Sequence, residues 1–190
     1  MNPSSFRKVF SSRTNLLCFI ALGAHLFVLS SNNTFYFLYL SEKKLFGNAA
    51  IFFLIVSLGV FASKLFGVFV FKRKVNPLFL AMLFLGLSVN QFMMPQAQHP
   101  FMILSYSVFL GVCSGFLIPI FMSIIRRQNQ QVQTSAMAVL FGMVDLGSLL
   151  GILCTGFFSG RISVVPALMV GSGVYFLFFL AICLFRKDFN

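Results

Sequence analysis

Two charged side chains, Lys64 and Asp145, stand deep inside long apolar segments. A charge at the centre of a bilayer costs on the order of 2.5 to 3.5 kcal/mol, so such residues are candidates for function. Lys64 lies eight residues before Lys72, and Asp145 lies eleven residues after Thr134. At 1.5 Å per residue these spacings give depths of roughly 12 and 16 Å from one side of the membrane. The sequence therefore predicts an ion pair that gates or couples movement. The alternative is a lysine that reaches the headgroups and an aspartate that is protonated or bonded to Ser148.

Neutral polar residues interrupt the first apolar segment, where residues 30–34 read Ser-Ser-Asn-Asn-Thr. Backbone opened inside a membrane must be satisfied by protein or by a water-filled cavity, so the run predicts a broken helix. His25 precedes Asn32 by seven residues and shares its helical face. His25, Asn32 and Asn33 are therefore candidates to line a substrate path. In the alternative, the run ends a shorter helix and His25 only bonds a neighbouring helix.

These residues belong to six apolar stretches, each approaching or exceeding the 20 or so residues that cross a hydrocarbon core. The predicted spans are Asn15 to Leu40, Asn48 to Phe71, Pro77 to Met94, Pro100 to Ile125, Thr134 to Phe158 and Val164 to Phe185. With 59% hydrophobic and 9% charged residues, too little polar surface remains for a soluble globule. The sequence thus predicts an all-α, polytopic membrane protein.

The basic residues indicate orientation, because most of them fall on one side of the predicted membrane. Ten lie on that side: Arg7, Lys8, Arg13, Lys72, Arg73, Lys74, Arg126, Arg127, Arg186 and Lys187. Only Lys43, Lys44 and Arg161 lie on the other. Lys and Arg accumulate on the cytoplasmic face, which predicts a multi-pass membrane protein with both termini inside. The net charge of +11 is therefore not read as a nucleic-acid partner.

Glycines at spacing four predict close helix packing. Gly111 and Gly115 in the fourth span, and Gly147 and Gly151 in the fifth, have this spacing; Gly142, also in the glycine-rich fifth span, is a further candidate. The segment 111–115 reads Gly-Val-Cys-Ser-Gly, which faintly resembles the signature of an intramembrane serine protease. Val112 stands where that signature has a glycine, and no membrane histidine lies downstream to act as the base. No metal-ligand spacing and no phosphate-binding loop occurs either, so we expect no enzyme, no metal and no cofactor.

The whole six-span chain resembles the carboxyl-terminal half of a major facilitator superfamily transporter. The resemblance rests on the basic segment Ser5 to Asn15, the polar first span, the run Ser114 to Ile120 and the segment Gln133 to Ala136 that opens a glycine-rich span. The family's cytoplasmic loop motif is matched in outline by Gly67 and the basic residues 72–74. Phe71 stands where that motif has an aspartate, which puts the gating role of the motif in doubt.

The resemblance implies a six-helix bundle of two inverted three-helix repeats, half of a major facilitator fold. It divides the chain into a cytoplasmic linker-like segment (1–14), a transmembrane domain (15–185) and a cytoplasmic tail (186–190). The first and fourth spans would face a central cavity, which adds Ser107 and Ser114 to the cavity candidates. The second and fifth spans would flank that cavity, which suits Lys64 and Asp145 for gating.

The resemblance also implies a location in the plasma (inner) membrane and a function as half of a secondary active transporter. It would move a small organic molecule by alternating access, with proton-coupled efflux favoured. Its partners would be the lipid bilayer, its substrate and a second six-helix half, either another copy or a separate polypeptide. The alternative is a non-transporting protein, either a truncated remnant or a small bundle that regulates another complex.

Overall fold

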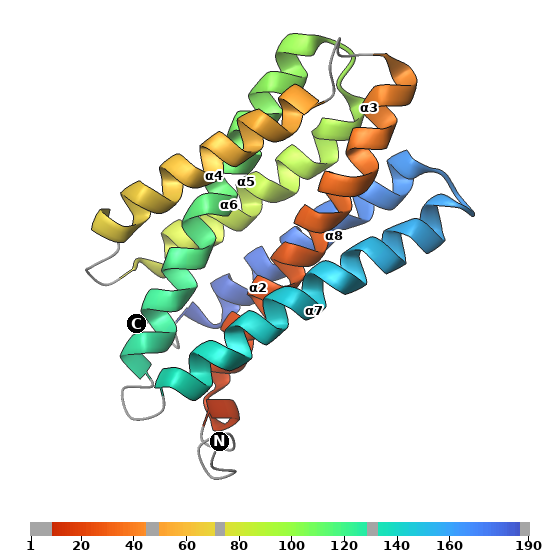
Figure 1. Cartoon of the computed structure of the whole chain (residues 1–190). Helices are drawn as coiled ribbons and strands as arrows, with labels where there is room; N and C mark the ends of the chain where they lie inside the picture. The colour runs from red at the N-terminus through yellow and green to blue at the C-terminus, as the bar shows by residue number, and fades with distance from the viewer. Residues whose placement is uncertain (1–8, 45–49, 71–74, 129–132, 187–190) are drawn as a thin grey trace.

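The computed structural model describes residues 9–44, 50–70, 75–128 and 133–186, which form helices and short connections without a β-strand. Six helical spans are long and apolar enough to cross a membrane, as the sequence predicts (Figure 1). The elements are α2 (Arg13–Ser31), the π-helical η1 (Asn32–Tyr36), α3 (Phe37–Lys43), α4 (Ala50–Val70), α5 (Pro77–Met93), the 3-10 turn η2 (Met94–Gln96), α6 (Pro100–Gln128), α7 (Gln133–Ser159) and α8 (Val164–Leu184).

Local sequence signals account for several helix ends. The Ser12 hydroxyl accepts a hydrogen bond from the backbone N–H of Asn15, which caps α2. Asn76 caps α5 by accepting from the N–H of Leu78, and Pro77 occupies the first helical position, where a missing N–H costs nothing. Lys44 ends α3 in a left-handed conformation with φ of 50°. The helix ends thus agree with the predicted spans to within a few residues wherever both are described.

The first span differs most from its prediction. It runs from Arg13 to Lys43, because α2, η1 and α3 continue one another without a break. The polar run does not open the backbone; it converts one stretch of the helix to π geometry from Asn32 onward. Both the broken helix and the shorter helix are therefore wrong. A π-helical turn is rare and frequently marks a functional position, so the run keeps its interest.

Each helix has one principal partner: α2 packs against α7, α4 against α6 and α5 against α8. In Figure 1, α4, α6, α2 and α7 follow one another across the side toward the viewer, with α4 and α7 at its two edges, while α8 runs behind α2. We call this side the open face and define it by the four helices α4, α6, α2 and α7.

Glycines bring two of these pairs into backbone contact. A Cβ at Gly147 would collide with the backbone of Gly23, and one at Gly111 would lie 3.2 Å from the Cα of Gly59. Gly115 and Gly151 continue the same two crossings one turn further along. Gly142 differs, because nothing lies within 4 Å of the position that its Cβ would take. It takes no part in the close packing that the sequence predicts for it.

One end of the bundle gathers the start of the first span and the ends of two others. The Arg13 guanidinium lies 4.3 Å from the centre of the Phe185 ring, and the Ser12 hydroxyl donates to Gln128 at 3.3 Å. The orientation of this end stays a prediction. Much of the charge argument for it depends on residues outside the described part of the chain: Arg7, Lys8, Lys72, Arg73, Lys74 and Lys187.

A matched pair of substitutions in α7 tests the packing. We expect Gly147→Ala to lower the free energy of unfolding by about 1–3 kcal/mol, because the added methyl overpacks the crossing with Gly23. Gly142→Ala has free space and should cost nothing, since alanine is the better helix former. Unfolding in detergent micelles, followed by circular dichroism, measures both. Equal losses for the two variants would contradict the packing described here.

Candidate functional site

An amide pair joins three spans in the interior. The Asn32 Nδ2 donates to Gln91 Oε1 at 2.7 Å, and the Gln91 Nε2 donates back to Asn32 Oδ1 at 2.9 Å. Gln91 Nε2 also donates to the carbonyl of Leu168 at 2.9 Å. Both amide side chains are fully buried. The first, third and sixth spans are therefore tied together by neutral hydrogen bonds, with no charge placed in the apolar interior.

His25 is buried where the first span meets α8. Its Nδ1 is 3.0 Å from the Tyr175 hydroxyl, and both side chains are buried. The Phe84 ring of α5 packs 6.1 Å from the Tyr175 ring. The other imidazole nitrogen, Nε2, has no hydrogen-bond partner among the described residues. The hydrogen-bonding capacity of this buried nitrogen is therefore not used within the described part of the chain.

A hydroxyl pair reinforces the crossing of α2 and α7. Thr155 donates to the Ser31 hydroxyl at 2.7 Å, and Ser31 lies within hydrogen-bond distance of the carbonyls of Phe27 and Gly151 at 2.8 and 3.0 Å. Ser31 and Thr155 are both buried. The contact holds the start of the π-helical turn against α7, directly beside the glycine that brings the two backbones together.

The predicted cavity residues fall into two groups. His25 and Asn32 share a face, as their spacing predicts, but that face points at α5 and α8 and is buried. Asn33, one residue on, is exposed. In α6, Ser107 is buried and donates to the carbonyl of its own helix at Ile103, whereas the buried Ser114 hydroxyl has no partner among the described residues. A cavity role for this set stays a prediction.

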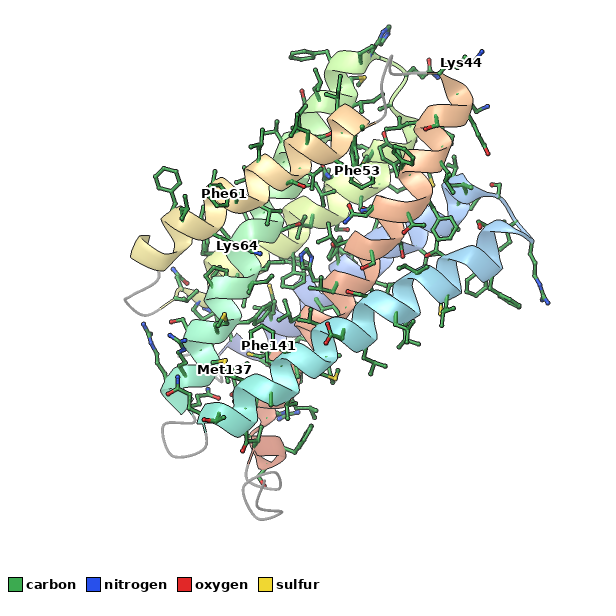
Figure 2. The ribbon with its side chains drawn as sticks, viewed as in Figure 1. Lys44, Phe53, Phe61, Lys64, Met137 and Phe141 are labelled. Atoms are coloured by element: carbon green, nitrogen blue, oxygen red, sulfur yellow. The ribbon has the colours of Figure 1, made fainter. Side chains whose placement is uncertain are left out.

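Lys64 and Asp145 do not form the predicted ion pair within the chain. Both are exposed, and they lie on α4 and α7, each of which packs against a different helix. In Figure 2 the Lys64 side chain extends from α4 toward the middle of the open face. Their charges are therefore available on the surface of the bundle rather than neutralised inside it.

Three partners in these contacts were not predicted: Gln91, Tyr175 and Thr155. Gln91 gave the strongest signal, because an amide within the short third span must find a partner in the membrane. The neighbouring Asn90 carries a similar signal, and its Nδ2 is buried without a partner among the described residues. Tyr175 and Thr155 gave little signal, since tyrosine and threonine are ordinary residues of membrane helices.

An apolar groove of about 300 Å³ runs between α2, α7 and α8. Its lining includes Ile20, Ala24, Leu146, Leu150 and Val174, and it offers no polar side chain to orient a ligand. In the described ranges no three His, Cys, Asp or Glu residues gather as a metal site would require. The chemistry on offer is thus neutral hydrogen bonding inside the bundle and two opposite charges on its open face.

Comparison with known protein families, characterised proteins and solved structures finds no match to this chain.

A double-mutant cycle tests the amide pair. We expect Asn32→Leu and Gln91→Met each to cost about 1–3 kcal/mol of unfolding free energy, because each leaves its buried partner unsatisfied. The double variant should cost less than the two singles together, by about 0.6–1.7 kcal/mol, the range of such couplings in membrane proteins. Unfolding by detergent titration gives the energies. Strictly additive losses would show that the two amides do not interact.

Proposed function

We propose that this chain is half of a secondary active transporter of the major facilitator type, built from two inverted three-helix repeats. A second six-helix half covers the open face, and a small organic molecule crosses between the halves by alternating access. The substrate site in such folds lies near the midplane at the interface of repeats, so one half supplies part of it.

The observation that carries the proposal is a repeat in the helix crossings. Gly23 meets Gly147 where α2 crosses α7, and Gly111 meets Gly59 where α6 crosses α4. Gly111 stands 88 residues after Gly23, and Gly147 stands 88 residues after Gly59. Exchanging two halves of the chain, 88 residues forward for Gly23 and 88 residues back for Gly147, therefore carries the first contact onto the second.

The next turn of each crossing follows the same rule. Gly151 contacts Phe27, and Gly115 contacts Ser63. Gly115 stands 88 residues after Phe27, and Gly151 stands 88 residues after Ser63. The third helix pair, α5 with α8, is carried onto itself by the exchange of repeats. Because three spans separate equivalent helices, each helix runs opposite to its equivalent, which supports an inverted relation.

The charges on the open face support a transport role. Lys64 and Asp145 lie on helices that would face the second half. Contacts between the two halves change as a transporter opens and closes. Asp145 supplies a carboxylate there as the proposed coupling group, and the buried His25 Nε2, which has no partner among the described residues, lies in the interior of the bundle. Efflux of an amphiphilic compound is favoured, because 28 phenylalanines can line an apolar path with few fixed charges.

One observation favours the second candidate, a bundle that does not transport. The amides of Asn32 and Gln91 bond each other and a backbone carbonyl inside the half. Such side chains stabilise the bundle without any ligand. A chain whose polar residues serve only its own packing would act as a structural or regulatory partner of another membrane protein.

A flux measurement separates the two. The purified chain is reconstituted in liposomes loaded with ethidium, an amphiphilic cation, and its exit is followed with and without an imposed pH gradient. We expect gradient-driven exit from wild type and its loss in Asp145→Asn, because that variant can no longer bind a proton. Ser105→Ala is the control, since Ser105 bonds only the carbonyl of Phe101 in its own helix. Wild-type liposomes that leak no faster than empty ones would favour the non-transporting candidate.

A further inference from the structure

We propose that the second half is another copy of this chain, docked face to face and parallel, with Lys64 of each copy paired with Asp145 of the other. The inference rests on the proposed function, because it names the partner that covers the open face. Its evidence is the placement of two opposite charges that the chain itself leaves unpaired.

Neither charge has a partner among the residues that the structure describes. Lys64 and Asp145 are exposed, and neither side chain makes a hydrogen bond or ion pair with any described residue. Each stands within an apolar span, so an exposed charge there faces either lipid or another protein. Charged residues within membrane spans normally pair with one another or face a cavity. An external partner of opposite charge satisfies both.

Both charges belong to the open face. The Phe53 ring of α4 lies 5.3 Å from the Phe37 ring of the first span. This contact shows which side of α4 is turned toward the other helices of the open face. Lys64 follows Phe53 by eleven residues, about three helical turns, and so lies on the same side. On α7, Phe141 lies on the open face in Figure 2, and Asp145 is its neighbour one turn along.

The two charges occupy opposite edges of that face. Lys64 is carried by α4 at one edge, and Asp145 by α7 at the other (Figure 1). A twofold axis that runs along the membrane normal, between the open faces of two copies, brings α4 of one copy opposite α7 of the other. In a twofold contact, a residue of the first copy that meets a given residue of the second is matched by the same contact with the two copies exchanged. One cation at one edge and one anion at the other therefore give two identical ion pairs.

The depths of the charges are compatible with contact. Lys64 lies six residues before the end of α4 and Asp145 twelve residues after the start of α7, which puts them about 9 and 18 Å from the same end of the bundle. Side chains lean toward the amino end of their helix. Because α4 and α7 run in opposite directions, Lys64 leans toward the depth of Asp145 and Asp145 leans back. The long lysine stem covers the remaining distance.

Aromatic side chains beside the charges supply packing surface. Phe61, one turn before Lys64, is 63% exposed, and Phe141, one turn before Asp145, is 50% exposed. Large apolar side chains around a charge pair exclude water and strengthen its attraction. A second copy offers the same arrangement in complementary order, which an unrelated partner would have to evolve separately.

The test exchanges charges between copies. One variant, Asp145→Lys, carries lysine at both positions; the other, Lys64→Asp, carries aspartate at both. We expect each variant alone to dimerise at least about tenfold more weakly than wild type, because like charges then face each other. Co-expressed with different affinity tags, the two should recover wild-type pairing as a mixed dimer. Lys44→Asp, a charge reversal at the end of α3, should leave pairing unchanged.

A neutral variant pair protects the test against loss of folding. In a background with Cys154→Ser and Cys183→Ser, chains carrying Ser57→Cys and Asp145→Cys are co-expressed and oxidised. Ser57 is exposed, lies two turns before Lys64 on the same side of α4, and at about 20 Å from that end of the bundle matches the depth of Asp145. We expect a disulfide between the two chains, and none when Leu177→Cys of α8, which is 66% exposed, replaces Asp145→Cys. Light scattering in detergent gives the mass of each species.

Several outcomes would overturn the pairing: a monomeric wild type, variants that dimerise as wild type does, a folded mixture without mixed dimers, or no specific disulfide. The ethidium measurement separates this proposal from the proposed function. Specific pairing without gradient-driven flux would remove the transport function and leave the dimer. Gradient-driven flux from a monomeric wild type, or flux from wild type when the cysteine variants form no specific disulfide, would remove the dimer and leave the transport function.

Discussion

Close backbone contact between helices is the constraint on which the rest of this structure depends. Lipid tails are as apolar as leucine, so an apolar side chain gains no hydrophobic energy by moving from lipid to the surface of a neighbouring helix. Helix association in a membrane therefore relies on close packing and hydrogen bonds. Gly23 with Gly147, and Gly59 with Gly111, let the backbones of two helix pairs approach directly. Those crossings fix which sides of α2 and α6 remain for α5, α8 and the open face. A Cβ at Gly111 or Gly147 would collide with the backbone of the facing helix, so the two helices could not pack as closely.

The polar residues divide according to the surface that the crossings assign to them. Neutral groups fill the interior: the amides of Asn32 and Gln91 bond each other, and Thr155 bonds Ser31. The two charges, Lys64 and Asp145, stay outside and unpaired within the described chain. The division has a physical reason. A neutral pair can be buried once its hydrogen bonds are made, whereas a buried ion pair must also overcome the desolvation of both charges.

The sequence was sufficient for the spans and for most of the packing residues. Length and apolarity identify a membrane helix without reference to its neighbours, and spacing four identifies where two helices can approach. Gly142 shows the limit, because it lies in the same glycine-rich span as Gly147 yet its Cβ position meets no other described helix. Which face of a helix meets a partner depends on the crossing angle, and periodicity alone does not give that angle.

The site was harder to predict than the spans, for the same reason. The spacing of His25 and Asn32 correctly places them on one face, and that face meets α5 and α8 inside the bundle. The depth estimates placed Lys64 and Asp145 at similar distances from one side of the membrane. Depth alone does not say where each helix lies within the plane of the membrane. Only the pairing of α4 with α6 and of α2 with α7 separates them. The polar run likewise gave no sign that a π-helical turn would absorb it.

The repeat in the crossings also relates two irregularities of the central helices. The π-helical turn begins directly after Ser31, and Pro119, inside α6, stands 88 residues after Ser31. Proline removes one hydrogen bond from a helix and clashes with the carbonyl four residues back, while a π turn lengthens its bonding pattern. Two different local chemistries thus weaken the first and fourth spans at equivalent places. In the alternating-access cycle proposed above, bending at these two points would let the two proposed repeats move in opposite directions. The glycine crossings next to these points would then keep each helix attached to its partner.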